Sequence, residues 1–139
     1  MNKTCYVYFF IVLLYACAVD PRIDLRELNI TNHSNKDIYY FYSQNDSVFS
    51  NASEYNLTWN KYMETNLILM NDTSTLTLEG KWEKYLSECP QGKFRLFFIE
   101  KNLVDVYGWK TIIKKNIYSN KILMDLSDMK RINWFLVYK

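Results

Sequence analysis

The side chains that most often carry catalysis are scarce in this chain of 139 residues. His33 is the only histidine, and no sequence signal provides the orienting partner that a general base requires. Cys89 is the only cysteine beyond the amino-terminal region, and no histidine lies near it in the sequence. The sequence has no Cys/His cluster of metal-site spacing and no glycine-rich phosphate loop. We therefore expect a protein that is not an enzyme and that uses no cofactor.

Two acidic segments supply carboxylates of the kind that hold calcium. These are Asn71-Asp72 and the segment from Asp125 to Asp128, and neither has the spacing of an EF-hand loop. A solvated turn and a helix cap account for them more simply, so the sequence predicts no metal site.

The amino terminus carries the clearest chemical signal. A short basic start precedes an apolar run from Cys5 to Leu14, which has the length of the hydrophobic region of a signal peptide. The run ends in Leu14-Tyr15-Ala16-Cys17, which resembles the lipobox of bacterial lipoproteins. In such signals the cysteine thiol receives a diacylglyceryl group, the chain is cleaved before the cysteine, and the new amino group is acylated. We predict that residues 1–16 are a signal peptide and that Cys17 carries the lipid.

Residues 17–27 would then tether the domain to a membrane. The apolar stretch ends at Val19 and falls short of the roughly 20 residues that a bilayer-spanning helix needs. Charges of both signs between Asp20 and Glu27 favour a solvated, flexible segment. Three acyl chains, at about 0.8 kcal/mol per buried CH₂ group, would hold the protein without a spanning helix. The alternative is an ordinary secretory cleavage site in which Cys17 is incidental.

Six N-x-Ser/Thr sequons in the domain favour a different interpretation, a secreted, N-glycosylated protein that binds another protein. They begin at Asn29, Asn32, Asn45, Asn51, Asn56 and Asn71. Small extracellular eukaryotic domains usually rely on paired cysteines, however, and Cys89 has no partner in the domain. In the bacterial interpretation, Asp46-Ser47-Val48 resembles a Bacteroides-type O-glycosylation acceptor, which makes Ser47 a candidate site.

Aromatic residues make up 17% of the chain and are the feature that suggests ligand binding. Exposed rings on an envelope protein can stack on sugars, although aromatic residues at strand spacing usually belong to a core. Trp59 is the strongest candidate because its neighbours in the sequence are mostly polar. The other rings with this potential are Tyr39, Phe41, Tyr62, Trp82 and Trp109.

The composition is that of a folded globular domain. Hydrophobic residues make up 49% of the chain and charged residues 23%, so a core is well supplied. The formal net charge is only +2, and acidic and basic residues are mixed along the chain. Because a nucleic-acid footprint needs clustered basic residues, we expect no nucleic-acid partner.

Short β-strands dominate the pattern of the domain. Strand patterns cover residues 27–32, 37–43, 67–70, 75–79, 93–100, 118–126 and 134–138. The polar segment 71–74 is typical of a connection between two antiparallel strands, and residues 44–60 of a long exposed loop. One amphipathic helix is predicted up to Lys115, with Asn102 as its N-cap and Asp105 completing a capping box. Shorter helical turns are expected at 83–86 and 127–133.

These elements predict residues 28–139 to be a single globular, β-rich domain. Strands that are apolar on at least one face are buried most simply in an antiparallel two-layer β-sandwich, here with one amphipathic helix. An α+β arrangement is the alternative, because residues 93–126 read as strand, helix and strand.

Three segments of the carboxy-terminal half resemble the small, uncharacterised lipoproteins of Bacteroidetes. The segments are Lys93 to Ile99, Tyr107 to Ile112, and Ile122 to Trp134. In those proteins an aromatic and aliphatic strand leads to a tryptophan-bearing helix, a turn of the form L-S-x-x-D/M-L and a final N-W strand. The resemblance implies a lipid-anchored protein of a Gram-negative cell envelope, at the outer membrane, and transfers no functional residue.

The sequence thus leaves two hypotheses. The first is a non-enzymatic binding or structural module of the bacterial envelope, attached to the membrane by its lipid and able to bind a glycan or a protein. The second is the secreted glycoprotein whose sequons are occupied.

Overall fold

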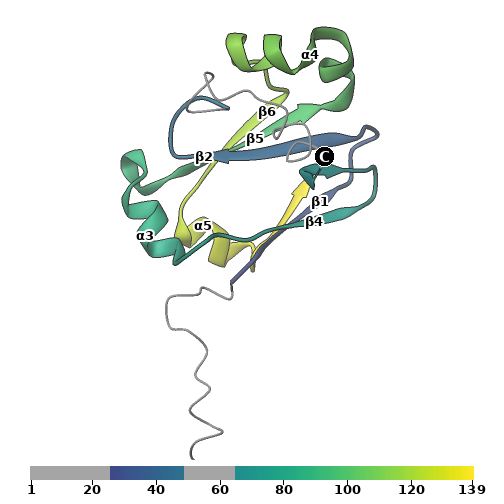
Figure 1. Ribbon diagram of the computed structural model, residues 1–139. Coiled ribbons are helices and arrows are strands. Elements are labelled where there is room, and N and C mark those ends of the chain that lie inside the picture. The colour runs from purple at the N-terminus through teal and green to yellow at the C-terminus, as the bar shows by residue number, and fades with distance from the viewer. Residues whose placement is uncertain (1–25, 49–64) are drawn as a thin grey trace, which may run out of the picture.

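The computed structural model describes residues 26–48 and 65–139 of the chain. Two sheets lie against each other, and a helix covers the outer face of the larger sheet (Figure 1). The predictions for residues 1–16, for Cys17 with most of its tether, and for Trp59 lie outside the described residues.

The larger sheet is antiparallel, with the strand order β3-β2-β5-β6. Its strands are β2 (Ile38–Ser43), β3 (Leu67–Ile68), β5 (Phe94–Glu100) and β6 (Asn120–Met124). β2 pairs with β5 along its whole length, from Ile38 opposite Glu100 to Ser43 opposite Arg95. These two strands form the centre of the domain.

The smaller sheet has the strand order β4-β1-β7. Its strands are β1 (Leu28–Asn32), β4 (Thr73–Leu76) and β7 (Phe135–Tyr138). β1 is antiparallel to β4 and parallel to β7, so the first and last strands of the domain lie side by side. The prediction of a mostly β, sandwich-like fold with a helix is confirmed, with β1 and β7 as the one parallel pair among the described strands.

The helices lie at two ends of the domain. α4 (Lys101–Lys115) lies at one end, and α3 (Trp82–Ser87), the 3₁₀ turn η2 (Pro90–Gly92) and α5 (Leu126–Arg131) lie toward the other (Figure 1). In residues 26–48 and 65–139, no helix is long and apolar enough to cross a bilayer.

The amphipathic helix is present, but its predicted N-cap is wrong. α4 begins at Lys101 with Glu100 as the N-cap residue, because β5 runs directly into the helix without a loop. Asp105 pairs with the Lys101 ammonium at 2.9 Å instead of completing a capping box on Asn102. Gly108, with φ of 69°, interrupts the helix, a conformation that glycine adopts without steric cost.

The predicted pairing of residues 67–70 with 75–79 is also wrong. β3 pairs with β2 in the larger sheet, whereas β4 pairs with β1 in the smaller one. The turn between them carries the chain from one sheet to the other, with the Asn71 N–H donating to the carbonyl of Asn32. Ile68 of β3 and Leu76 of β4 both pack in the apolar cluster between the two sheets.

Strand β5 separates two apolar clusters by simple alternation. Phe94, Leu96 and Phe98 share one face of the strand, face the space between the sheets and are fully buried. Phe97 and Ile99 face the opposite way and pack under α4 with the fully buried Ile112. A strand buried on both faces has a nearly continuous apolar sequence, which explains why this strand has the clearest pattern in the chain.

We predict that Leu96→Ala destabilises the domain by about 2 to 5 kcal/mol, because it leaves a cavity between the two sheets. Leu123, on the adjacent strand β6, is 42% exposed and is the matched control, with an expected loss below about 1 kcal/mol for Leu123→Ala. Denaturant unfolding of both variants measures the difference. Similar losses for the two substitutions would contradict this assignment of the core.

Candidate functional site

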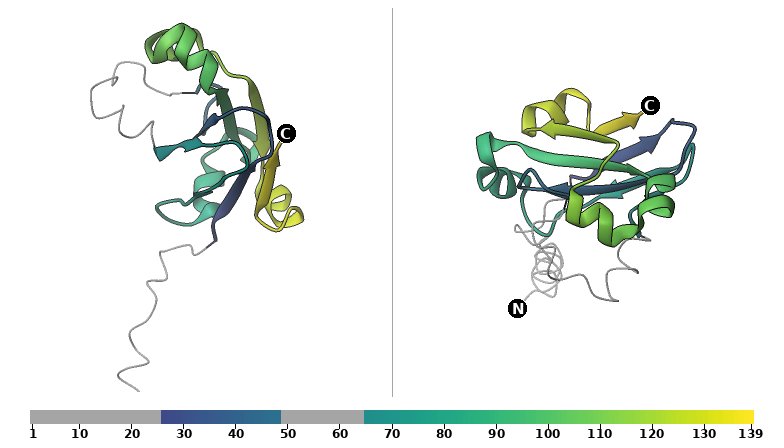
Figure 2. Two further views of the ribbon diagram at one scale, coloured as in Figure 1. Left: turned by 90° about the vertical axis from the view of Figure 1, so that its right-hand side faces the viewer. Right: turned by 90° about the horizontal axis from the view of Figure 1, so that it is seen from above.

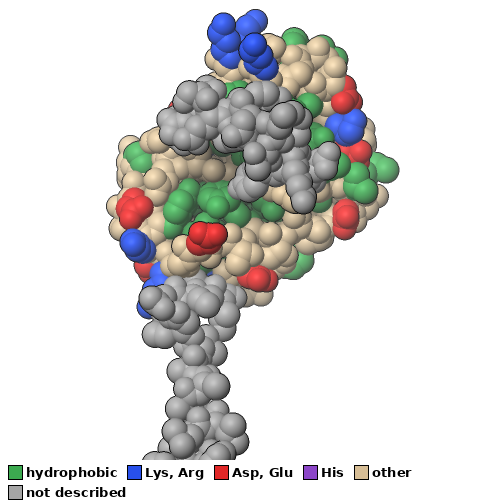
Figure 3. All heavy atoms as spheres, viewed as in Figure 1, with side chains coloured by type: hydrophobic (Ala, Val, Ile, Leu, Met, Phe, Trp, Pro, Cys, Tyr) green, Lys and Arg blue, Asp and Glu red, His purple; other side chains and the backbone are tan. Residues whose placement is uncertain are grey.

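A cavity of about 270 Å³ opens between the two sheets, on the side where β3 and β4 form the sheet edges. On this face the surface is hollowed between β2 and the chain that leads from β4 to α3, with hydrophobic side chains at the base (Figure 3). Eight residues line the cavity: Tyr40, Tyr42, Thr65, Asn66, Ser74, Thr75, Leu76 and Thr77.

The two walls of the cavity come from different sheets. Tyr40 and Tyr42 point inward from β2, because the alternate residues Tyr39 and Phe41 face α4. The opposite wall is β4 and the residue after it, where the inward position 74 is a serine. A small polar side chain opposite a tyrosine leaves space that two apolar side chains would fill.

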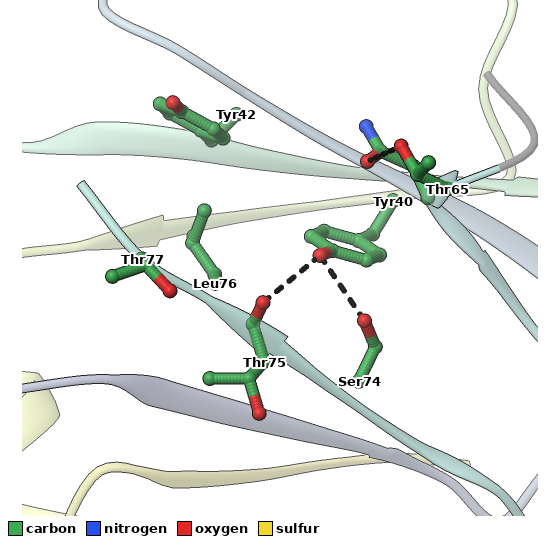
Figure 4. Close-up of a pocket in the computed structure, with 8 residues that line it drawn as sticks. Tyr40, Tyr42, Thr65, Ser74, Thr75, Leu76 and Thr77 are labelled. Atoms are coloured by element: carbon green, nitrogen blue, oxygen red, sulfur yellow. Dashed lines mark hydrogen bonds between the residues drawn. The ribbon is translucent and has the colours of Figure 1, made fainter. Parts of the chain in front are cut away.

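The phenol group of Tyr40 connects the two walls of the cavity by hydrogen bonds. Its Oη donates to the carbonyl oxygen of Thr75 at 3.3 Å and accepts from Ser74 Oγ at 3.2 Å (Figure 4). Both distances are long for hydrogen bonds between oxygen atoms. On the β2 side, the Asn66 carbonyl accepts from the Tyr40 N–H at 3.1 Å and so holds residue 66 at the rim. The cavity is therefore lined by the hydroxyl groups of Tyr40 and Ser74, which lie on paired strands, and by the amide of Asn66, which precedes β3.

A second cavity, of about 360 Å³, lies between α3 and α5. Its lining is mostly apolar and includes Leu86 and Leu126. Asp125 also borders it, but the carboxylate of this residue caps α5. Its few polar groups make it a weaker candidate for specific recognition than the cavity at Tyr40.

The carboxylates at 125 and 128 serve the helix cap that the sequence suggested for them. Asp125 Oδ1 accepts from the Asp128 N–H at 2.9 Å and from Ser127 Oγ at 2.6 Å, and Asp128 completes a capping box. The Lys93 ammonium lies 3.3 Å from the Asp125 carboxylate. These hydrogen bonds lower the pKa of Asp125 well below its usual value, and the bond from Ser127 has the largest effect. Among the residues that the structure describes, no group of acidic, histidine or cysteine side chains could hold a metal ion.

Most of the aromatic residues considered for sugar stacking are part of the core. Trp82 is fully buried, and Tyr39 and Phe41 are buried under α4. Trp109 packs edge-on against both of these rings, at centroid distances of 4.8 and 5.7 Å. Trp59 and Tyr62 lie outside the described residues.

Ser47, the candidate O-glycosylation site, lies in a turn whose flanking residues Asp46 and Val48 contact other parts of the fold. The Asp46 carboxylate pairs with the Lys121 ammonium at 2.6 Å, and Lys121 lowers the pKa of Asp46. Val48 is buried under α4, and its N–H donates to Asn116 Oδ1 at 2.8 Å. Ser47 itself is partly buried. The residues that flank Ser47 in the D-S-V pattern thus have structural roles of their own.

Neither His33 nor Cys89 lines either of the two cavities described above. His33 is exposed at the end of β1, where its N–H donates to the Tyr138 carbonyl. Cys89 is buried, and its Sγ donates to the carbonyl of Tyr85 at 3.3 Å. Burial raises the pKa of the Cys89 thiol, which keeps it protonated and unreactive.

Comparisons with known proteins leave the geometry as the basis for assigning a site. No protein-family model matches the chain, and neither the curated proteins nor the solved structures gave a match. The cavity at Tyr40 was also missed by sequence reasoning, because its two walls are brought together only by the placement of β4 in the smaller sheet.

We predict that Asp125→Asn makes the stability of the domain less sensitive to acid. A carboxylate whose pKa is lowered by folding stabilises the native state above its unfolded pKa, near 3.8, and this contribution is lost as the pH falls. Chemical unfolding at about pH 7 and about pH 3 should show a smaller difference for the variant than for the wild type. Equal differences would contradict the role of this carboxylate.

Proposed function

We propose that this chain is a lipid-anchored protein of a bacterial cell envelope, a non-enzymatic binding module attached to the outer membrane through Cys17. The observation that carries the proposal is the apolar leader that ends in Leu14-Tyr15-Ala16-Cys17, a short distance before a folded domain. The first strand of that domain begins at Leu28, which leaves residues 17–27 as the tether. The resemblance to small lipoproteins of Bacteroidetes supports the same location.

The position of Arg26 supports a defined exit for the tether. The Arg26 carbonyl accepts a hydrogen bond from Trp82 Nε1 at 2.9 Å, and its guanidinium pairs with Glu83 at 2.6 Å. The guanidinium also lies over the ring of Trp134, 5.3 Å from its centroid. The start of β1 lies beside α5, at the end of the domain away from α4 (Figures 1 and 2). A membrane anchor before residue 26 would therefore join the domain at the end away from α4.

The cavity at Tyr40 supports binding as the activity of the module. It lies between β2 and β4, on the side of the sandwich where β3 and β4 form the sheet edges. Tyr40 and Ser74 offer hydroxyl groups on strands that the two sheets hold in place, and Asn66 adds an amide.

We predict that Cys17→Ala moves the protein from the membrane fraction to the soluble fraction in a Bacteroides-type host, because the acyl chains would have no site of attachment. Cys5→Ala is the matched control, since Cys5 lies within the leader, and it should leave partitioning unchanged. Detergent phase separation and immunoblotting measure both variants. A wild-type protein that is soluble, or a Cys17→Ala variant that still partitions with membranes by acylation, would overturn the proposed anchor.

The alternative function is a secreted, N-glycosylated protein that binds another protein. Two of its sequons, at Asn45 and Asn71, have exposed asparagines, which favours this alternative. Asn32, in contrast, is fully buried, and its Nδ2 donates to the carbonyls of Lys36 and Ile68 at 2.7 and 3.2 Å. A glycan on Asn32 would break these bonds and could not fit in the fold.

If the alternative holds, the protein secreted by a eukaryotic cell should carry glycans on Asn45 and Asn71 and none on Asn32. The buried carboxamide of Asn32 leaves no room for a sugar in folded protein. Peptide mass spectrometry, with enzymatic release of glycans in heavy water, maps the occupied sites. Unmodified Asn45 and Asn71, or a folded protein glycosylated at Asn32, would count against the alternative.

A further inference from the structure

We propose that the cavity between Tyr40 and Ser74 binds one ring of a neutral saccharide. The proposal rests on the function as a binding module and names the class of ligand that this module takes. It follows from the charge, the polarity, the aromatic wall and the size of the cavity.

The charge of the lining selects a neutral ligand. None of the eight residues that line the cavity carries a charged side chain. Sites for carboxylates and phosphates use arginine, lysine or clustered N–H groups, and sites for cations use carboxylates. An ionic ligand would lose its hydration here without gaining a counter-charge.

The polar groups select a ligand that both donates and accepts hydrogen bonds. Ser74 brings a hydroxyl group from the inward face of β4, and Asn66 brings an amide from the β2 side. A wholly apolar ligand would cover these groups without satisfying them, at a cost of about 1 to 3 kcal/mol for each lost hydrogen bond. Sugar hydroxyls donate and accept in the same way as these side chains do.

The aromatic wall suits the C–H face of a sugar ring. The ring of Tyr42 lines the cavity on the same wall as Tyr40 (Figure 4). It packs edge-on against Tyr85 at a centroid distance of 5.8 Å, which fixes its orientation. Leu76 adds an apolar surface on the opposite wall. An aromatic ring and a leucine side chain beside hydroxyl and amide groups match a ligand that has one apolar face and polar edges.

The size selects a single ring. At about 270 Å³, the cavity lies just below the range of roughly 300 to 1,000 Å³ that is usual for sites of drug-sized ligands. Both walls belong to paired strands, β2 with β5 and β4 with β1, so the site exists before the ligand binds. The end of a glycan, rather than a long stretch of it, fits these dimensions.

The test measures binding of methyl glycosides of neutral hexoses and N-acetylhexosamines to the full-length lipoprotein in detergent, with glucuronic acid as the charged probe. Ser74→Trp places a large side chain inside the cavity, and Thr73→Trp places the same side chain at the neighbouring position of the same edge strand but outside the lining. We expect at least one neutral glycoside to bind, with an affinity at least about tenfold lower in Ser74→Trp and within about twofold of wild type in Thr73→Trp.

Ser74→Ala is the second variant, because it removes one hydroxyl group with little change of volume, and we expect about threefold to tenfold weaker binding. Unfolding midpoints close to wild type for the variants show that a loss of affinity is local. The inference is overturned if no neutral glycoside binds, if binding survives Ser74→Trp, or if glucuronic acid binds more tightly than every neutral probe. None of these results touches the lipid anchor, which membrane partitioning tests separately.

Discussion

The pairing of β2 with β5 is the contact on which the rest of the domain is assembled. Because both strands are apolar on both faces, this pair cannot face water on either side. The smaller sheet, α3 and α5 pack on one face of the pair, and α4 packs on the other. Fully burying a large apolar side chain contributes about 1.5 to 3 kcal/mol, and Phe94, Phe97 and Phe98 all lie on β5. Helix α4 and the smaller sheet therefore shield the two faces of the β2–β5 pair from water.

The same alternation along β2 creates the candidate site. The inward positions run from Ile38, which is fully buried, to Tyr40 and Tyr42, whose rings reach the open side of the sandwich. Opposite them, the inward residues of β4 are Ser74 and Leu76, and only Leu76 is a large apolar side chain. The core is close-packed near β1 and ends in a cavity lined by hydroxyl groups near β4. The cavity therefore forms where β4, in the smaller sheet, presents few large apolar side chains to the core.

Local patterns predicted the strands well, because period-two alternation and apolar runs are visible within a few residues, as in Phe94 to Glu100. They could not predict which strands pair. Residues 67–70 and 75–79 read as a hairpin, yet they belong to different sheets. The N-cap prediction at Asn102 failed because β5 runs directly into α4, which places Asn102 inside the helix. The cavity was missed for the same reason as the pairing, since its walls come from separate sheets. The buried sequon at Asn32 shows the same limit, because a three-residue pattern says nothing about burial.

The central claim is that the domain is held at a membrane by lipid on Cys17, and the mass of the mature protein tests it most directly. The measurement is intact mass spectrometry, with fragmentation of the amino-terminal peptide, on protein purified from a Bacteroides-type host. We expect a chain that begins at Cys17 and carries a diacylglyceryl group and an N-linked acyl chain. A chain that begins at another residue, or that begins at Cys17 without lipid, would contradict the account.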